Sequence, residues 1–275
     1  MRGDASGFAE YAAADQEPTR RTLLHLAALL GDLMATDLTV VGGLVPSLII
    51  PVAREPHCGT LDVDVGLSLA LRRVGGHAAV PDRLRENGFR PTTDEDGNIV
   101  PWRWRTPGHP AAVTIDFLMP ARGADHDVWA RLTPDFAPVR TPGLQLVRHD
   151  WLLVDLRGST LAGEDVRCRI RVCGPGAFVV LKARALRERR RPKDAYDLHY
   201  VLKHLGGGVE DVATALRGLT NDDDARQALA WLAEDYAALD SIGPVQVAAF
   251  LQGARDDELQ ADARGRVPRL LSLLD

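Results

Sequence analysis

The chain has 275 residues, 45% of them hydrophobic, which is enough for one large domain or two small ones. Its longest apolar run, 44–52, is far shorter than the roughly 20 residues of a membrane span, and its polar start lacks the features of a signal peptide. We therefore expect a cytoplasmic protein with no membrane segment. The net charge of −5 and the aromatic content of 5% argue against a general nucleic-acid-binding surface, so RNA contact would need a local basic patch.

The first ninety residues predict helices and strands in alternation. Residues 1–20 look like an irregular arm, and the spacing of apolar residues predicts a helix over 22–34. A β-branched run predicts a buried strand over 38–41, and strict alternation of apolar and polar residues predicts a second strand over 61–67. A short helix follows over 80–87.

Asp96-Gly97 predicts a hairpin turn, and alternation predicts a further strand over 112–118. Several strand-like runs lie within 144–170. Because helices and strands interleave over this part of the chain, we expect an α/β (α+β) fold, a mixed sheet flanked by helices. The three cysteines have no CxxC spacing, which argues against a disulfide framework or a zinc site.

The chain changes character at Gly174-Pro175-Gly176, beyond which almost every pattern is helical. We therefore expect two domains, an α/β domain over 1–172 and a C-terminal helical domain over 173–275. The helices predicted in the second domain span 176–189, 193–204, 209–218, 223–238, 244–255 and 264–274.

Three acidic residues lie on two of the predicted strands. Asp62 and Asp64 are two residues apart, so both side chains leave one face of their strand while Val63 faces the core. Asp116 is a lone acid in an apolar strand. Neighbouring carboxylates repel one another unless a cation lies between them, and Mg²⁺ prefers carboxylate oxygens together with substrate phosphates. The three acids fit a two-metal site, although a DxD on a strand also suits a solvated face.

A Gly42-Gly43 pair follows the first strand directly. Glycine lets backbone N–H groups approach a phosphate closely, and the start of a helix favours an anion. The hydroxyl groups of Ser47 and Thr60 can add hydrogen bonds to a nucleotide. A simple turn also accounts for the two glycines, and nothing in the chain matches the P-loop or Rossmann glycine motifs.

The combination of these motifs resembles the nucleotidyltransferase superfamily of the polymerase-beta type. The matching segments are Val40-Val41-Gly42-Gly43, Thr60-Leu61-Asp62-Val63-Asp64-Val65 and Thr114-Ile115-Asp116-Phe117. The resemblance implies that the domain over 1–172 is the catalytic one. The segment between the glycine pair and the DxD strand is longer than is usual in this superfamily, and the extra length predicts a loop around 50–58.

The C-terminal part narrows the resemblance. Lys182 lies on a predicted helix that ends in arginines, and the next helix opens with Arg191-Pro192-Lys193-Asp194-Ala195-Tyr196-Asp197-Leu198. A lysine followed by arginines and a KDxxDL helix is similar to the AbiEii-type abortive-infection toxins, which include the MenT toxins. The whole resemblance covers roughly residues 38–204.

The resemblance implies a role for each of these residues. The three acids would bind Mg²⁺ or Mn²⁺, and Asp116 would be the third acid or the general base. Lys182 would contact the triphosphate of an NTP, and Asp197 would orient Lys182 or a neighbouring group. Lys193 and Asp194 would support the nucleotide site. Lys182, Asp194 and Asp197 also suit an ordinary helix, as a snorkelling lysine, a first-turn acid and part of a solvated face respectively.

Two basic segments can hold an RNA acceptor. In Trp102-Arg103-Trp104-Arg105, tryptophans that stack on a base alternate with arginines that bind phosphate, although an edge strand with one packed face fits the same pattern. His57, just before the DxD strand, fits either a nucleotide contact or a local hydrogen bond. The second basic segment consists of Arg187, Arg189, Arg190, Arg191 and Lys193.

The leading hypothesis is a toxin of a two-gene toxin–antitoxin module that transfers NMP from an NTP to an acceptor. The resemblance implies the 3′ end of tRNA as the acceptor and a cognate antitoxin as a partner. A small-molecule nucleotidyltransferase of the antibiotic-modifying kind is an alternative, which an acidic acceptor pocket would favour. A catalytically silent module that binds NTP or RNA is a third interpretation.

Overall fold

The internal contacts of the chain divide it into two compact units. Unit 1 consists of Met1–Ala14, Val45–Gly59 and Gly174–Asp275, and unit 2 consists of Asp15–Leu44 and Thr60–Cys173. The C-terminal segment of unit 1 begins two residues after the expected domain boundary, and two segments from the first part of the chain join it. The computed structural model describes residues 7–14, 16–68, 76–106, 113–121 and 129–274.

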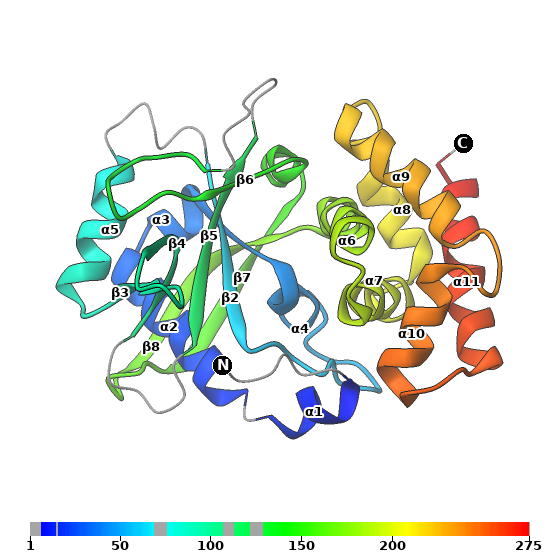
Figure 1. Cartoon of the computed structure of the whole chain (residues 1–275), viewed down its shortest axis with the longest axis horizontal. Helices are drawn as coiled ribbons and strands as arrows, with labels where there is room; N and C mark the ends of the chain where they lie inside the picture. The colour runs from blue at the N-terminus through cyan, green and yellow to red at the C-terminus, as the bar shows by residue number, and fades with distance from the viewer. Residues whose placement is uncertain (1–6, 15, 69–75, 107–112, 122–128, 275) are drawn as a thin grey trace. The chain divides into compact units, whose positions relative to one another are not determined.

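Unit 2 is built on a mixed sheet with the strand order β3-β4-β5-β2-β1-β8-β7, and β6 pairs with β5. At its centre β2 runs parallel to β5 and antiparallel to β1, and Figure 1 shows β2 and β5 side by side. The strands are β1 Leu38–Val41, β2 Asp62–Leu67, β3 Arg90–Thr93, β4 Ile99–Arg105, β5 Thr114–Pro120, β6 Val139–Thr141, β7 Trp151–Ser159 and β8 Asp165–Cys173.

The helices of unit 2 are α2 (Glu17–Leu30), α3 (Leu33–Thr36) and α5 (Gly76–Glu86). Helix α2 packs against β7 and β8, and α3 packs against β8 and β1. The helix expected over 22–34 begins earlier and is interrupted at Gly31, whose φ of 57° a glycine adopts without strain. Together with the sheet and the helices of unit 1, these elements confirm the mixed α/β fold.

Three other expectations about elements need correction. The irregular arm over 1–20 instead contains α1 (Phe8–Ala13) and the first turn of α2. The strand-like runs over 144–170 are a 3₁₀ turn followed by the long antiparallel ribbon of β7 and β8. The strand expected over 112–118 begins at Thr114, and Ala112 lies outside the described residues.

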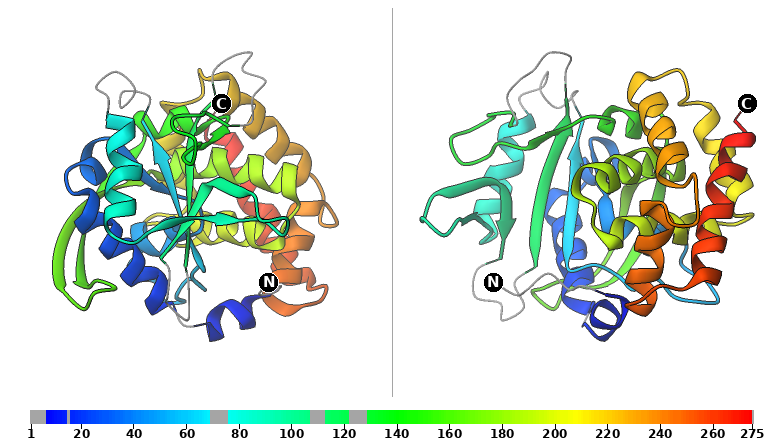
Figure 2. Two further views of the ribbon diagram at one scale, coloured as in Figure 1. Left: turned by 60° about the vertical axis from the view of Figure 1, so that its left-hand side comes forward. Right: turned by 45° about the vertical axis from the view of Figure 1, so that its right-hand side comes forward.

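The C-terminal segment of unit 1 is helical, as expected. Helix α10 packs against both α7 and α11, and α6 packs against α7 (Figure 2). The short helix α4 (Val45–Ile49) packs on α7 as well. Helix α11 begins earlier than expected, because the side chain of Asp256 caps its first turn. The helices are α6 Pro175–Arg189, α7 Pro192–His204, α8 Val209–Arg217, α9 Asp223–Asp235, α10 Ile242–Gln252 and α11 Asp257–Ser272.

Among the described helices, none has both the length and the apolar character that a membrane crossing requires. The core of each unit is instead made of buried aliphatic and aromatic side chains. In unit 2 these include Phe117 and Trp104 on the sheet and Leu26 on α2, each with no exposed surface.

Candidate active site

The three predicted acids share one face of the sheet in unit 2. Strands β2 and β5 are in register, so Asp64 lies opposite Asp116 and Asp62 lies opposite Thr114. Val63, which alternates with the acids, has no exposed surface, whereas the acids are half-buried. The packed side of β2 thereby holds the carboxylates on its other side. We refer to Asp62, Asp64 and Asp116 as the carboxylate face.

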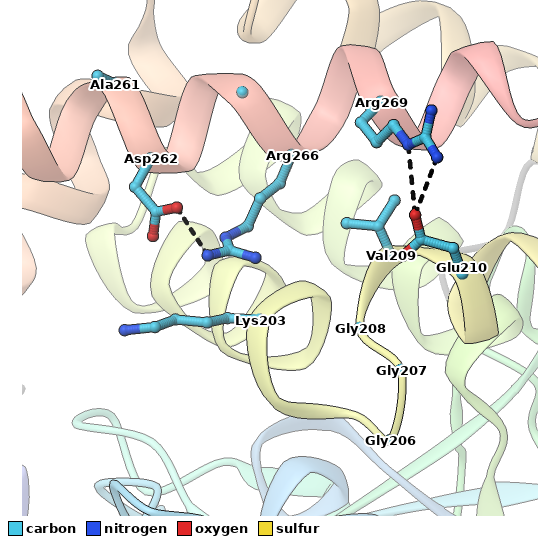
Figure 3. A pocket seen from close by; sticks show the side chains of 11 residues that line it. Lys203, Gly206, Gly207, Gly208, Val209, Glu210, Ala261, Asp262, Arg266 and Arg269 are labelled. Atoms are coloured by element: carbon cyan, nitrogen blue, oxygen red, sulfur yellow. Dashed lines mark hydrogen bonds and ion pairs between the residues drawn. The ribbon is translucent and has the colours of Figure 1, made fainter.

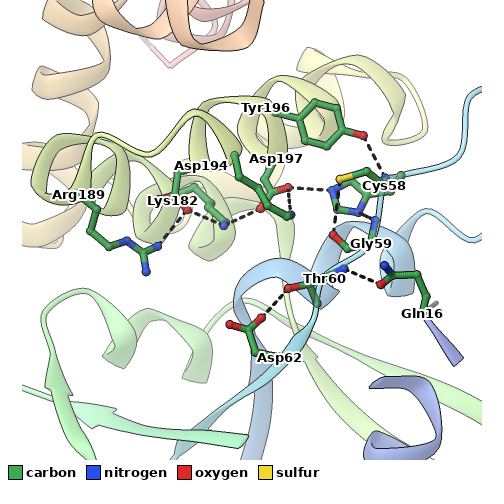
Figure 4. Close-up of polar contacts among 12 residues, drawn as sticks. Gln16, Cys58, Gly59, Thr60, Asp62, Lys182, Arg189, Asp194, Tyr196 and Asp197 are labelled. Atoms are coloured by element: carbon green, nitrogen blue, oxygen red, sulfur yellow. Dashed lines mark hydrogen bonds and ion pairs between the residues drawn. The ribbon is translucent and has the colours of Figure 1, made fainter. Parts of the chain in front are cut away.

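Thr60 positions the first of these acids. Its Oγ1 donates a hydrogen bond of 2.5 Å to Oδ1 of Asp62 (Figure 4). The backbone N–H of Thr60 donates to the side chain of Gln16, and Thr19 donates to the Thr60 carbonyl. Thr60 is buried by these contacts, so its hydroxyl orients Asp62.

Gly42 leaves room for the carboxylate of Asp64. Strand β1 ends at Val41, opposite Asp64, and Gly42 follows with a φ of 70° in the left-handed region. A Cβ atom on Gly42 would overlap the carboxylate of Asp64. The glycine pair therefore has a steric role beside the carboxylate face in addition to the phosphate-binding role expected of it. Gly43 is buried in the same short 3₁₀ turn.

The carboxylate face also contains Arg103, which the sequence did not single out by itself. Arg103 lies opposite Asp116 on β4 and donates two hydrogen bonds to its carboxylate, 2.7 Å from Nε to Oδ1 and 2.6 Å from the guanidinium to Oδ2. Hydrogen bonding to Asp116 raises the pKa of Arg103, against the opposing effect of burial, and the charges of Asp62 and Asp64 raise it further.

The rest of the Trp102-Arg105 segment is packed. Trp104 has no exposed surface, so it does not stack on a base, and Trp102 stacks on Trp129 with 5.1 Å between ring centroids. Strand β4 lies between β3 and β5, so it is not an edge strand either. Only the arginines of this segment are exposed. The informative pattern in the sequence was the two-residue spacing of Arg103 and Arg105, which places both side chains on one face of the strand.

The chemistry of the carboxylate face fits a divalent cation. Three carboxylates supply hard oxygen donors of the kind that Mg²⁺ takes, and Gly42 leaves room for the one on Asp64. In the arrangement seen here, Arg103 binds both oxygens of Asp116. Among the described residues, no three His, Cys, Asp or Glu side chains lie close enough together to hold a metal ion as they stand. A cation held by all three acids would therefore require their side chains to move, and Asp116 is the one held by Arg103.

A second polar cluster lies in unit 1, between α6 and α7 (Figure 4). Nζ of Lys182 lies 2.9 Å from Asp194 and 2.7 Å from Asp197, and Lys193 donates to Asp197 at 2.7 Å. Burial opposes the charge on Lys182, but the two carboxylates outweigh it and raise the pKa of Lys182 above its ordinary value. Burial likewise opposes the charge on Asp197, and the lysines hold its pKa well below the usual range. We call these four residues, with His57, the buried cluster.

His57 anchors the segment Val45–Gly59, which contains α4 and the loop after it, on α7. The N–H of Gly59 donates to Nδ1 of His57 at 3.1 Å, so the ring proton is on Nε2, which lies 2.9 Å from Asp197. Burial lowers the pKa of His57 and keeps the ring neutral. The ring also stacks on Tyr196, with 5.2 Å between centroids. Of the two interpretations of His57, the structure shows the local hydrogen bond.

The arginines expected to bind RNA are partly neutralised within unit 1. Arg187 pairs with Glu234 and Asp235, and Arg189 pairs with Asp194. Arg190 and Arg191 are exposed at the junction between α6 and α7. Ser47, the other polar residue expected to contact a nucleotide, is exposed on α4.

A pocket of about 550 Å³ in unit 1 is lined by none of the predicted site residues (Figure 3). It is lined by Gly206–Gly208 and by residues of α11. Its arginines are paired inside the pocket, Arg266 with Asp262 and Arg269 with Glu210. The pocket therefore offers little net charge to an anion.

The comparisons with known proteins agree with this chemistry. Residues 127–275 match a family model described as "Nucleotidyl transferase AbiEii toxin, Type IV TA system", and a comparison with curated proteins found no match. The matched part contains Lys182 and the KDxxDL helix but begins after Asp116, so the carboxylate face is an independent observation. Because the match covers more than half of the chain, the chain belongs to the AbiEii family of nucleotidyltransferase toxins.

Proposed function

We propose that this nucleotidyltransferase transfers NMP from an NTP to the 3′ end of tRNA, in a reaction that requires Mg²⁺. Membership of the family makes the chain a toxin of a toxin–antitoxin system, and it implies a cognate antitoxin. The proposed metal-dependent transfer is supported by the register of β2 and β5. This register sets Asp64 opposite Asp116, beside Asp62, on one face of the sheet. Such a set of acids suits the transfer of a phosphoryl group.

The carboxylate face would hold Mg²⁺ or Mn²⁺. When bound, the cation neutralises charge on the phosphates and stabilises the leaving pyrophosphate. Thr60 keeps Asp62 oriented for this role. Asp116 would act as the third acid or as the base that takes the proton from the attacking 3′ hydroxyl. That oxygen bonds to the α-phosphorus as the bond to the pyrophosphate oxygen breaks.

The buried cluster supports a role for Lys182 as the lysine that contacts the triphosphate. The two carboxylates keep Lys182 charged despite its burial, and a compact ammonium group suits a phosphate. Asp197 would orient Lys182, and Lys193 and Asp194 would support it. We also keep Gly42, Gly43 and Ser47 as candidates for contact with the nucleotide.

RNA binding would rely on the exposed arginines at the α6–α7 junction. Arg190 and Arg191 are exposed there, and Arg187 and Arg189 pair with acids. Phosphate contacts of this kind give affinity without sequence specificity. The global charge of −5 makes such a local patch necessary.

The proposal is tested with purified protein, each α-labelled NTP in turn, Mg²⁺ and total tRNA. We expect label at the tRNA 3′ end, and none after periodate oxidation of the terminal ribose or with EDTA in place of Mg²⁺. Asp64→Asn should abolish labelling, and Asp96→Asn, on an exposed hairpin turn, is the matched control. Nucleotide binding that depends on Mg²⁺ and Asp64, without label in tRNA, would exclude tRNA and direct the search to a protein or small-molecule acceptor.

A further inference from the structure

Arg103 pairs directly with Asp116 of the carboxylate face. Strands β4, β5 and β2 lie side by side, and their register aligns Arg103, Asp116 and Asp64 in one row across the sheet. The guanidinium binds both carboxylate oxygens of Asp116. The Arg103 side chain is 44% exposed and that of Asp116 is 14% exposed, so the pair is open to exchange with a solvated ligand.

Arg103 and a divalent cation compete for the carboxylate of Asp116. A divalent ion needs an oxygen of Asp116, and each of those oxygens accepts a hydrogen bond from Arg103. Two positive charges at one carboxylate also repel each other. Because the Arg103 side chain is 44% exposed, water and salt screen the ion pair and lower the cost of the exchange.

We propose that Arg103 is a substrate-binding residue that Asp116 holds in the metal-free enzyme and that binds a phosphate group of the nucleotide once Asp116 has taken the cation. The inference rests on the proposed function, because it needs the metal site at the carboxylate face. It adds a phosphate ligand that belongs to β4, outside the part of the chain matched by the family.

The chemistry of the side chain supports phosphate as its second partner. A guanidinium group presents a planar fork of N–H donors that fits two oxygens of a carboxylate or of a phosphate equally well. Release from Asp116 would leave that fork on the same face as the acids that hold the cation. A nucleotide brings both the cation's phosphate ligands and the oxygen acceptors for Arg103.

Arg105 provides a matched control. It lies two residues further along β4, on the same face and exposed, but its register partner is Thr114 instead of an acid. Arg103→Gln and Arg105→Gln remove the same charge from the same face of the same strand. Any general electrostatic effect of the charge is therefore common to both variants, and a difference between them reports on the pairing with Asp116.

The first measurement is the affinity for Mn²⁺ without nucleotide, by calorimetry or by electron paramagnetic resonance of free Mn²⁺. We expect Arg103→Gln to bind Mn²⁺ roughly fivefold to tenfold more tightly than the wild type, because the competing cation is gone. Arg105→Gln should change the affinity by less than about twofold, and Arg103→Lys should lie between wild type and Arg103→Gln. Circular dichroism and thermal melting check that each variant is folded.

The second measurement is the affinity for α,β-methylene NTPs at saturating Mn²⁺, because their α–β bridge cannot be cleaved. We expect Arg103→Gln to weaken this binding by roughly tenfold or more, with Arg103→Lys less affected and Arg105→Gln close to wild type. The two variants of Arg103 would thus bind metal more tightly and nucleotide more weakly. A residue with a merely structural role would weaken both.

The outcomes separate the inference from the function on which it rests. If Mn²⁺ binds in a way that Asp64→Asn abolishes, but Arg103→Gln and Arg105→Gln behave alike in both measurements, the inference is wrong and the metal site stands. Equal or weaker Mn²⁺ binding by Arg103→Gln overturns it as well. If the wild type shows no Mn²⁺ binding that depends on Asp64, the proposed metal site fails and the inference fails with it.

Discussion

Asp64 and Asp116 are direct register partners on two parallel strands, and Asp62 stands two residues before Asp64 on the same face. Three carboxylates so placed repel one another, and Arg103 offsets part of that repulsion at Asp116. The arrangement therefore favours function over stability at this point of the sheet. A variant that removes one of these negative charges should therefore lower activity without lowering stability.

We expect Asp64→Asn to lower transfer by about a hundredfold or more, because a metal site of this kind supplies several kcal/mol to the reaction. The same change should leave the free energy of unfolding unchanged or raise it by up to about 1 kcal/mol, because it relieves repulsion on a half-buried surface. Transfer assays and urea unfolding on the same preparations measure both. A loss of activity that simply follows a loss of stability would contradict the assignment.

Gly42 and Gly97 provide a steric test of the carboxylate face. Both have positive φ, 70° and 82°, but an added Cβ at Gly42 would overlap Asp64 whereas the one at Gly97 meets nothing within 4 Å. Gly97→Ala therefore measures the backbone strain alone, about 1 kcal/mol. We expect Gly42→Ala to cost about 1–3 kcal/mol more and to reduce transfer strongly, because Asp64 must move. Equal effects of the two changes on activity would argue against a fixed Asp64.

Much of the fold could be predicted from local patterns. Strands over 38–41 and 61–67 alternate cleanly or are β-branched, and the six C-terminal helices have periodic apolar positions. The ribbon of β7 and β8 was harder, because charged residues such as Asp155 and Arg169 pair across it and interrupt the apolar pattern on its exposed side. The length of the ribbon follows only from the register in which the two strands pair.

The candidate site also has a part that local sequence patterns predict and a part that they do not. The parity of Asp62 and Asp64 follows from strand geometry, so their shared face could be predicted. The pairing of Arg103 with Asp116 depends on which strands are neighbours and in what register, which no local pattern reports. The contact of His57 with Asp197 joins residues 140 positions apart, so its partner was hidden in the same way.

Asp197 should be far more important for stability than a surface acid on a neighbouring helix. Its side chain has no exposed surface and accepts from Lys182 and Lys193. We expect Asp197→Asn to cost about 3–5 kcal/mol, because it leaves buried lysine charge without its partner. Glu188→Gln removes the exposed (i, i+4) pair with Arg184 and should cost less than about 0.5 kcal/mol. Chemical unfolding at pH 7 compares them, and similar costs would contradict the view that the cluster is an ionised, buried network.

The neutral His57 predicts a dependence of stability on pH. Burial lowers the pKa of His57 below the ordinary value of 6.5, so the unfolded chain takes up this proton more readily than the folded one. Stability from His57 is then complete above about pH 6.5 and is lost as the pH falls through that value toward the lowered pKa. The proton would go to Nδ1, which accepts a hydrogen bond from the N–H of Gly59. Protonation therefore breaks this hydrogen bond and weakens the anchor of the segment Val45–Gly59 on α7.

The variant His57→Gln isolates this effect from other histidines of the chain. Glutamine can still donate to Asp197 but does not titrate, so the variant should be less stable at pH 7.5 and lose less stability on acidification. The difference between the two curves of unfolding free energy against pH has a slope of at most one proton, confined to the region below about pH 6.5. The protection of the amides in the loop 50–59 against hydrogen exchange, after correction for the intrinsic effect of pH, should fall in the same range for the wild type alone. Parallel curves for the two proteins would mean that the pKa of His57 is the same in the folded and unfolded states, and the lowering by burial would then be wrong.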